Sequence, residues 1–281
     1  MTGALAVAAA MLAGAAHANI DLFAATEHSD NRVPGQGENS TQQLFVGHGY
    51  TGPNAVAAID GTSPNGATWN DMANASFGTL RFSTSAGGPG GSTAETATAS
   101  FEDELLFNNL PAGTAGVATF HLHLTGELYS EGSGAWDYLV RLESNRGATQ
   151  SVSGASAAGG GLVDIDQMLT FTIAFVSGQT TNIRLLGHSG VNIFGQPGGT
   201  FGHPGSAYAD FSHTALWGGL TSAVTTGGVD VTHDLQVTGN SGFNYEAAAP
   251  TGVPEPVSWA LMLVGFGGVG VGLRRRRRAV A

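Results

Sequence analysis

The sequence predicts an all-β fold: an antiparallel β-sandwich of jelly-roll-like type, flanked by an N-terminal signal peptide and a single C-terminal transmembrane helix. Three observations in the central part of the chain lead to it. Short segments alternate apolar and polar residues with a period of two. Clusters rich in Gly and Pro separate them, and no amphipathic helix of about ten or more residues is visible. One apolar face per strand supplies enough core for two packed sheets.

Four segments show the alternation best. They are 117–128, 137–143, 168–176 and 229–237. In the first, Ala118, Phe120, Leu122 and Leu124 share one face, whereas Thr119, His121, His123 and Thr125 share the other. Each segment is expected to be a half-buried strand.

The body is expected to extend from 19 to 246, with a more irregular part over 19–74, where the alternation is weaker. A linker with the sequence AAAPTGV follows at 247–253. No fixed-period repeat of a solenoid or propeller is visible.

The composition excludes several chemistries. The 281 residues contain no cysteine and no lysine, so a thiolate nucleophile, a cysteine-ligated metal, a Walker-type phosphate loop and a Schiff-base lysine are absent. The body carries five arginines against twenty acidic residues, a formal charge of −15. We therefore expect no nucleic-acid partner, because phosphate neutralisation supplies most of that affinity.

The first 18 residues indicate a secretory signal peptide. Met1–Ala18 is an apolar run that closes on the small residues Ala16 and Ala18, a typical cleavage signature. The positive n-region of such peptides is missing, which a start codon placed too late would explain. The alternative is a short core helix.

The C-terminal end indicates a membrane anchor. Residues 257–273 are 17 positions without a charge, the lower limit for a spanning helix. The arginine block that follows predicts a cytoplasmic C-terminus and a stop to translocation, and it comprises Arg274, Arg275, Arg276, Arg277 and Arg278. A buried core helix with a solvated tail is the alternative.

These residues resemble a known family of sorting signals. The motif comprises Pro254, Glu255, Pro256, Trp259, Gly265 and Gly267, followed by the arginine block. It is similar to the PEP-CTERM sorting signal in its PEPxxWA variety and covers residues 254–281. The resemblance implies processing by an exosortase-type membrane protease, transient anchoring in the inner membrane, and delivery to the cell surface or an exopolysaccharide matrix. It implies nothing about an activity of the body.

Two histidines and one serine are candidates for chemistry. His121 and His123 lie two apart on the polar face of one strand, so both could reach one metal, but no third ligand is identifiable; exposed strand histidines are the alternative. His233 falls on the apolar face of its segment and is expected to be a core or edge residue. Ser189 sits in a sequence close to a nucleophile elbow, but an extended segment follows instead of a helix.

Carboxylates and aromatic residues supply the remaining candidates. Glu102-Asp103-Glu104 and Asp164-Ile165-Asp166 offer oxygen ligands for structural Ca²⁺, although no calcium-loop spacing is present; a solvated acidic face is the alternative. A sugar-stacking platform could form from Trp69, Trp136, Trp217, Tyr129, Tyr138 and Tyr208, which could equally be core residues.

The sequence therefore predicts an exported, non-enzymatic envelope or matrix protein associated with exopolysaccharide or biofilm. No catalytic residues, no metal and no cofactor are assigned, apart from the open question of calcium. The alternative is a carbohydrate-binding or carbohydrate-active secreted module.

Overall fold

The computed structural model describes residues 20–31, 40–46, 54–62, 66–88, 92–193 and 204–249. All of them belong to one compact unit, Met1–Ala249. The predicted signal peptide at 1–18 and the sorting segment at 254–281 lie outside the described residues. Within the part described, no helix is long and apolar enough to cross a membrane.

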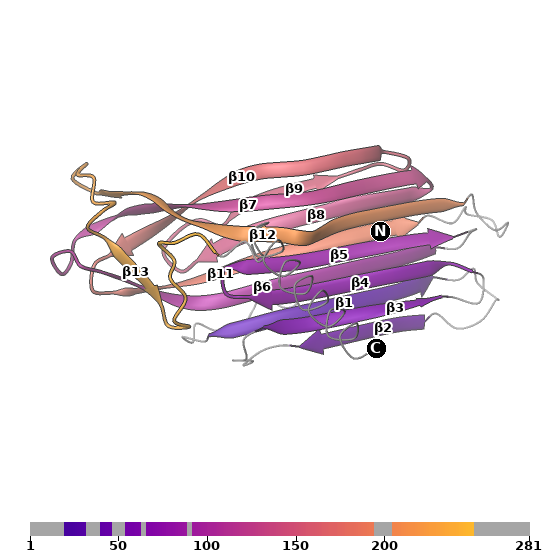
Figure 1. Ribbon diagram of the computed structural model, residues 1–281, viewed down its shortest axis with the longest axis horizontal. Coiled ribbons are helices and arrows are strands. Elements are labelled where there is room, and N and C mark those ends of the chain that lie inside the picture. The colour runs from indigo at the N-terminus through magenta and orange to yellow at the C-terminus, as the bar shows by residue number, and fades with distance from the viewer. Residues whose placement is uncertain are drawn as a thin grey trace, which may run out of the picture. The chain divides into compact units, whose positions relative to one another are not determined.

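The described residues are all-β, and every strand pairing is antiparallel (Figure 1). The strands are β1 (Asp21–Asn31), β2 (Ser40–Val46), β3 (Ala55–Thr62), β4 (Thr68–Ser76), β5 (Thr79–Gly88), β6 (Ser92–Asn108), β7 (Ala115–Gly132), β8 (Gly134–Ser144), β9 (Gln150–Ala155), β10 (Gly161–Val176), β11 (Thr180–Ile193), β12 (Gly205–Thr225) and β13 (Gln236–Gly239).

The strands form two sheets that pack face to face. Sheet A has the order β2-β1-β6-β11-β8-β9, with β13 also paired to β6. Sheet B has the order β10-β7-β12-β5-β4-β3. Contacts of β5 with β6 and β11, and of β4 with β1 and β6, join the two sheets.

The pairing of the eight strands β5 to β12 is nested. Strand β5 pairs with β12 and β6 pairs with β11, while β7 and β8 lie on the far sides of those partners. In Figure 1, the orange strand β12 runs between β7 and β5, which are far from it in sequence. The N-terminal strands β1 to β4 extend both sheets at one side.

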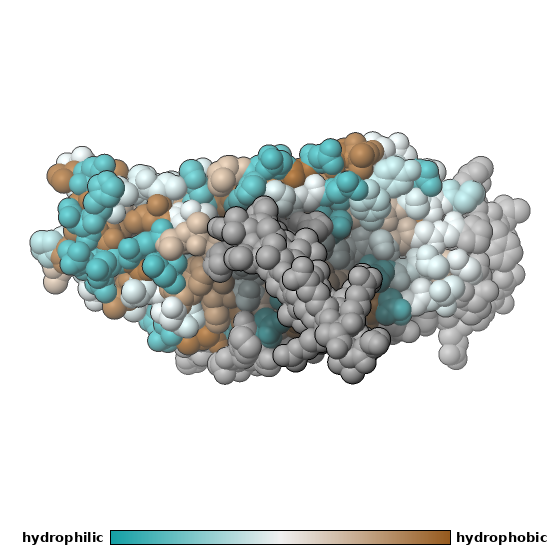
Figure 2. All heavy atoms as spheres, in the orientation of Figure 1, coloured by the Kyte–Doolittle hydropathy of each residue, from teal (hydrophilic) through white to brown (hydrophobic). Residues whose placement is uncertain are grey.

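Three of the four strands predicted from alternation are confirmed. They lie within β7, β8 and β10. Their apolar faces form part of the core, including Phe120, Leu122, Val140, Phe171 and Ile173. On the face seen in Figure 2, hydrophilic and hydrophobic residues are interspersed over the described part.

The prediction of a strand over 229–237 is wrong for most of its length. Only Gln236–Gly239 is a strand, because Asp230 Oδ1 accepts hydrogen bonds from the backbone N–H and the hydroxyl of Thr232 and starts a turn. His233 lies in this turn and is exposed, so its predicted core or edge position is also wrong. The stretch 19–74, expected to be more irregular, contains strands β1 to β4.

The two sheets approach closely at Gly187 of β11. A Cβ atom at this position would lie 2.1 Å from the ring of Phe82 on β5. Phe82 in turn stacks on Phe211 of β12 at a centroid distance of 4.9 Å, and Tyr138 of β8 packs on Phe211 at 5.1 Å. The missing side chain at Gly187 therefore makes room for an aromatic cluster that joins the sheets.

The segment after β13 is fixed to both sheets. Tyr245 donates its hydroxyl hydrogen to Asp103 Oδ2 on β6 at 2.8 Å, and Trp217 Nε1 on β12 donates to the carbonyl of Tyr245 at 2.9 Å. Burial and the carboxylate of Asp103 raise the pKa of Tyr245 well above its ordinary value. Asp103, predicted to lie in an acidic cluster, is thus a buried structural residue, 2% exposed.

Candidate functional site on the outer face of sheet B

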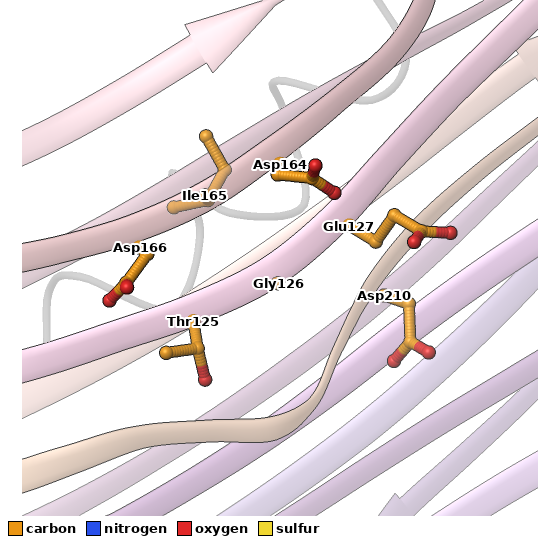
Figure 3. A pocket seen from close by; sticks show the side chains of 7 residues that line it. All are labelled: Thr125, Gly126, Glu127, Asp164, Ile165, Asp166 and Asp210. Atoms are coloured by element: carbon orange, nitrogen blue, oxygen red, sulfur yellow. The ribbon is translucent and has the colours of Figure 1, made fainter.

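A hollow opens on the solvent side of sheet B, where β10, β7 and β12 lie side by side (Figure 3). Its lining comprises Thr125, Gly126 and Glu127 of β7, Asp164, Ile165 and Asp166 of β10, and Asp210 of β12. The strand register places Glu127 directly between Asp164 and Asp210. Carboxylates from three adjacent strands therefore face the same opening.

A bulge in β12 shapes the hollow. Asp210 pairs with Glu127, but the next pair joins Thr214 to Thr125, so three residues of β12 oppose Gly126 alone. The backbone N–H of Ser212 donates to Asp210 Oδ1 at 2.8 Å and fixes that carboxylate. Bulges of this kind bend a strand and redirect its side chains.

Gly126 is required at the floor of the hollow. A Cβ atom there would lie 2.5 Å from the ring of Phe211 beneath it. The glycine therefore makes room for the Phe211 ring below the floor and presents only backbone to the opening.

A pair of tyrosines lies beside the hollow, one step along the same strands. Tyr129 of β7 and Tyr208 of β12 are directly paired, and their rings stack at a centroid distance of 5.5 Å and an angle of 25°. Both lie on the outer face of the sheet with Glu127, because residues two apart on a strand share a face.

Carboxylates hold both tyrosine hydroxyls. Tyr129 donates to Glu131 Oε2 at 2.7 Å, and Tyr208 donates to Glu127 Oε1. The hydrogen bond to Glu127 is the largest cause that raises the pKa of Tyr208 to about 12. The pKa of Tyr129 is raised by its bond to Glu131, and the bonds from Tyr129 and Ser206 lower the pKa of Glu131. The rings are therefore oriented before any ligand binds.

His123 and Asp166 close the other side of the hollow. His123 Nε2 lies 2.6 Å from Asp166 Oδ1, and both side chains are well exposed. No three His, Asp or Glu side chains in the described ranges converge in a way that could hold a metal ion. In these ranges, neither the histidine pair nor the acidic clusters gain the further ligands that a zinc or calcium site needs.

The remaining predicted candidates lie elsewhere. Of the six aromatic residues considered for sugar stacking, Trp69, Trp136, Trp217 and Tyr138 are buried in the core, which leaves Tyr129 and Tyr208 on the surface. Glu127 and Asp210 were not predicted, because their position beside Asp164 depends on a strand register that the sequence does not display.

The surroundings of Ser189 are not those of a catalytic nucleophile. It is fully buried and accepts a hydrogen bond from Thr84. The neighbouring His188 points to the opposite face of β11, where its Nδ1 lies 2.9 Å from Thr98 Oγ1. The residues after the serine were predicted to be extended over 191–194, and those described, 191–193, belong to β11, so the strand–turn–helix of an elbow does not form.

Comparisons with known proteins add little to this geometry. No family model matches the chain, and no curated protein matches it. Among solved structures, the carbohydrate-binding module TmCBM61 in complex with β-1,4-galactotriose aligns with 57% of this chain and 85% of its own, at 11% identity and a TM-score of 0.18. The VP2 subviral particle of infectious bursal disease virus aligns with 92% and 75%, at 14% identity and a TM-score of 0.13. Scores this low do not establish a shared fold.

Proposed function

We propose that the body is a jelly roll that binds a hydroxyl-rich glycan on the outer face of sheet B. The nested order of β5 to β12 supports the jelly roll, because β5-β12-β7-β10 and β6-β11-β8-β9 are the two four-stranded halves of that topology. The proposal of glycan binding rests on one observation, the stacked pair Tyr129–Tyr208 beside the carboxylate-lined hollow.

The chemistry of this face suits a neutral sugar. A tyrosine ring offers an apolar surface on which the C–H groups of a sugar ring can pack. The carboxylates of Asp164 and Asp210 accept hydrogen bonds and do not donate them when ionised, so they complement hydroxyl donors. A few placed polar groups beside an aromatic surface are typical of small-molecule sites.

The arrangement favours binding over hydrolysis. A glycosidase places two carboxyl groups on opposite sides of the bond that it cleaves, about 5–9 Å apart. Here Asp164, Glu127 and Asp210 all project from one face of a single sheet, and Glu127 is occupied by Tyr208. We therefore assign no catalytic role to them.

A glycan array with the full-length chain tests this proposal, followed by titration of the best polysaccharide. Replacing Tyr208 by Ala is expected to weaken binding by roughly tenfold to hundredfold, because it removes half of the aromatic surface. Asp210→Asn is expected to weaken it less, and Asp60→Asn on β3 is the matched control that should not change it. A folded chain that binds none of the neutral polysaccharides, or binds equally well without Tyr208, contradicts the proposal.

We also propose that the chain is exported and sorted by its C-terminal segment. Support comes from the order of its parts: the tripeptide Pro254-Glu255-Pro256, an uncharged stretch at 257–273 and the block Arg274–Arg278. By this proposal, an exosortase-type protease processes the chain at the inner membrane and releases it to the cell surface or the extracellular matrix.

Processing can be followed by chain size and cell fractionation. Replacing Pro254 and Pro256 together by Ala should leave a larger form in the inner membrane. Pro250→Ala, a few positions upstream, is the matched control and should be processed normally. Unchanged processing and surface delivery of the double variant would show that the sorting assignment is wrong.

A further inference from the structure

Three ionisable side chains meet in the interior, away from the glycan face. His28 of β1 and Glu95 of β6 are directly opposed in sheet A, with His28 Nδ1 2.6 Å from Glu95 Oε1. Asp71 of β4 joins them from sheet B and interacts with both. The residues are 0%, 0% and 1% exposed. Such groups are rarely buried completely unless they are paired.

Strand β4 also covers the histidine. The imidazole of His28 stacks on the indole of Trp69 at a centroid distance of 3.7 Å and an interplanar angle of 7°. Trp69 and Asp71 are two apart on β4 and face inward together. Sheet B therefore supplies both a ring and a carboxyl group to a pair that sheet A holds, and these contacts join β1 to β4.

The other elements around Asp71 supply neutral groups. Thr84 of β5 is paired with Asp71 in the register, and its hydroxyl donates to Ser189 of β11. On β3, the residue paired with Asp71 is the apolar Ile59. Within the described ranges, the charges that act on Asp71 are those of Glu95 and His28.

Ionisation of Asp71 is unfavourable at this position. Among the described residues, its carboxyl group lies with the carboxyl group of Glu95 and the imidazole of His28, and all three are buried away from water. A buried negative charge beside a second carboxyl group is costly, and the charge of His28 and a backbone hydrogen bond at Ser85 offset this cost only in part. Burial, followed by the charge of Glu95, raises the pKa of Asp71 from its ordinary 3.8 to about 10.

We propose that His28, Glu95 and Asp71 form a proton-dependent latch that holds β1 against sheet B and weakens as the surroundings become alkaline. The latch is independent of the glycan-binding face, because it lies between the sheets.

The direction of the pH effect follows from linkage. Between pH 3.8 and about 10 the folded chain keeps a proton on Asp71 that the unfolded chain releases. The stabilisation of the folded chain that depends on this proton is complete below pH 3.8 and decreases as the pH rises toward about 10. One proton of this kind raises the unfolding equilibrium constant about tenfold for each pH unit.

Urea denaturation of the full-length chain in a mild detergent, at several pH values from about 6 to 9, tests the latch. For each pH unit, the unfolding constant of the wild type should rise by a factor about ten times larger than that of Asp71→Asn, because the variant lacks the proton that Asp71 releases on unfolding. Asp60→Asn, the same change at an exposed position, should keep the wild-type slope. Equal slopes in the wild type and Asp71→Asn would overturn the proposal.

Two measurements on the wild type keep the proposal testable if the variant does not fold. Infrared spectroscopy should detect a protonated carboxyl group at neutral pH that disappears in strong alkali; its absence at neutral pH overturns the proposal. Amide hydrogen exchange, corrected for its intrinsic pH dependence, should show β1 losing protection at lower pH than β7. If both strands lose protection together, the effect is a general loss of stability and the latch is wrong.

Discussion

Tyr245 donates its hydroxyl hydrogen to Asp103 across 142 positions of sequence, and this contact ties the segment after β13 to the middle of sheet A. Asp103 also accepts from the hydroxyl and the backbone N–H of Ser241. The backbone N–H of Glu104 also donates to Asp103 Oδ1, so four donors converge on one buried carboxylate and satisfy it without a basic residue.

Replacing Tyr245 by Phe should destabilise the fold. The change keeps the ring among Phe243, Trp217 and Phe101 but leaves a buried carboxylate with one donor fewer. We expect a loss of about 1–3 kcal/mol in the free energy of unfolding, measured by urea denaturation. Tyr129→Phe removes a hydroxyl from the surface and should change stability by less than about 0.5 kcal/mol. Equal effects of the two variants would mean that the bond to Asp103 contributes nothing.

Gly187 should not tolerate a side chain. Gly187→Ala places a methyl group against the Phe82 ring and should cost about 1–3 kcal/mol or more through overpacking. Gly227→Ala is the matched control, since the nearest atom to its added Cβ is 3.7 Å away. The combination of Gly187→Ala with Phe82→Leu should cost less than the sum of the two single changes. Strict additivity, measured by denaturation, would contradict a direct contact.

The side chain of Gln150 on β9 protects the β10 edge of sheet B. Its side-chain amide donates to the carbonyl of Thr172 at 2.7 Å and accepts from the N–H of Thr172 at 3.0 Å, as a neighbouring strand would. Gln150→Ala leaves the backbone N–H and C=O of Thr172 without these partners and should increase self-association through this edge. Sedimentation velocity over a range of concentrations measures the effect. Gln236→Ala serves as the control, and a Gln150→Ala variant as monomeric as that control would refute the role.

Glu127 should control the titration of Tyr208. Glu127→Gln removes the charged acceptor that stabilises the protonated phenol, so the pKa of Tyr208 should fall from about 12 toward its ordinary 10. Alkaline difference spectroscopy of the phenolate absorption follows this change. Asp164→Asn, on the opposite side of Glu127, should leave the titration of Tyr208 in place. An unchanged profile in Glu127→Gln would mean that this hydrogen bond does not exist in solution.

The fold could be predicted where a single physical signal dominates. Residues 116–125 of β7 and 168–176 of β10 alternate strictly, since one face is core and the other is solvent. The stretch 229–237 has the same alternation but turns at Asp230, where a side-chain oxygen competes for backbone N–H groups. The alternation of apolar and polar residues alone does not reveal that competition.

The candidate site could be predicted only in part. The pair Asp164 and Asp166 and the tyrosines were identifiable as residue types, but Glu127 and Asp210 join them only through the register of β10, β7 and β12. The interior cluster was not predictable, because charged residues are normally exposed and its members come from separate strands of two sheets.

The nested pairing of β5 with β12 has a consequence for the time at which the protein folds. Gly88 pairs with Gly205, and β12 occupies the centre of sheet B between two strands that precede it by many residues. A chain whose contacts are so distant in sequence folds slowly, because the closure entropy of long loops precedes the gain from pairing. Sheet B cannot be completed until the β12 residues have been synthesised, so the native fold of a nascent chain is reached only late in its synthesis.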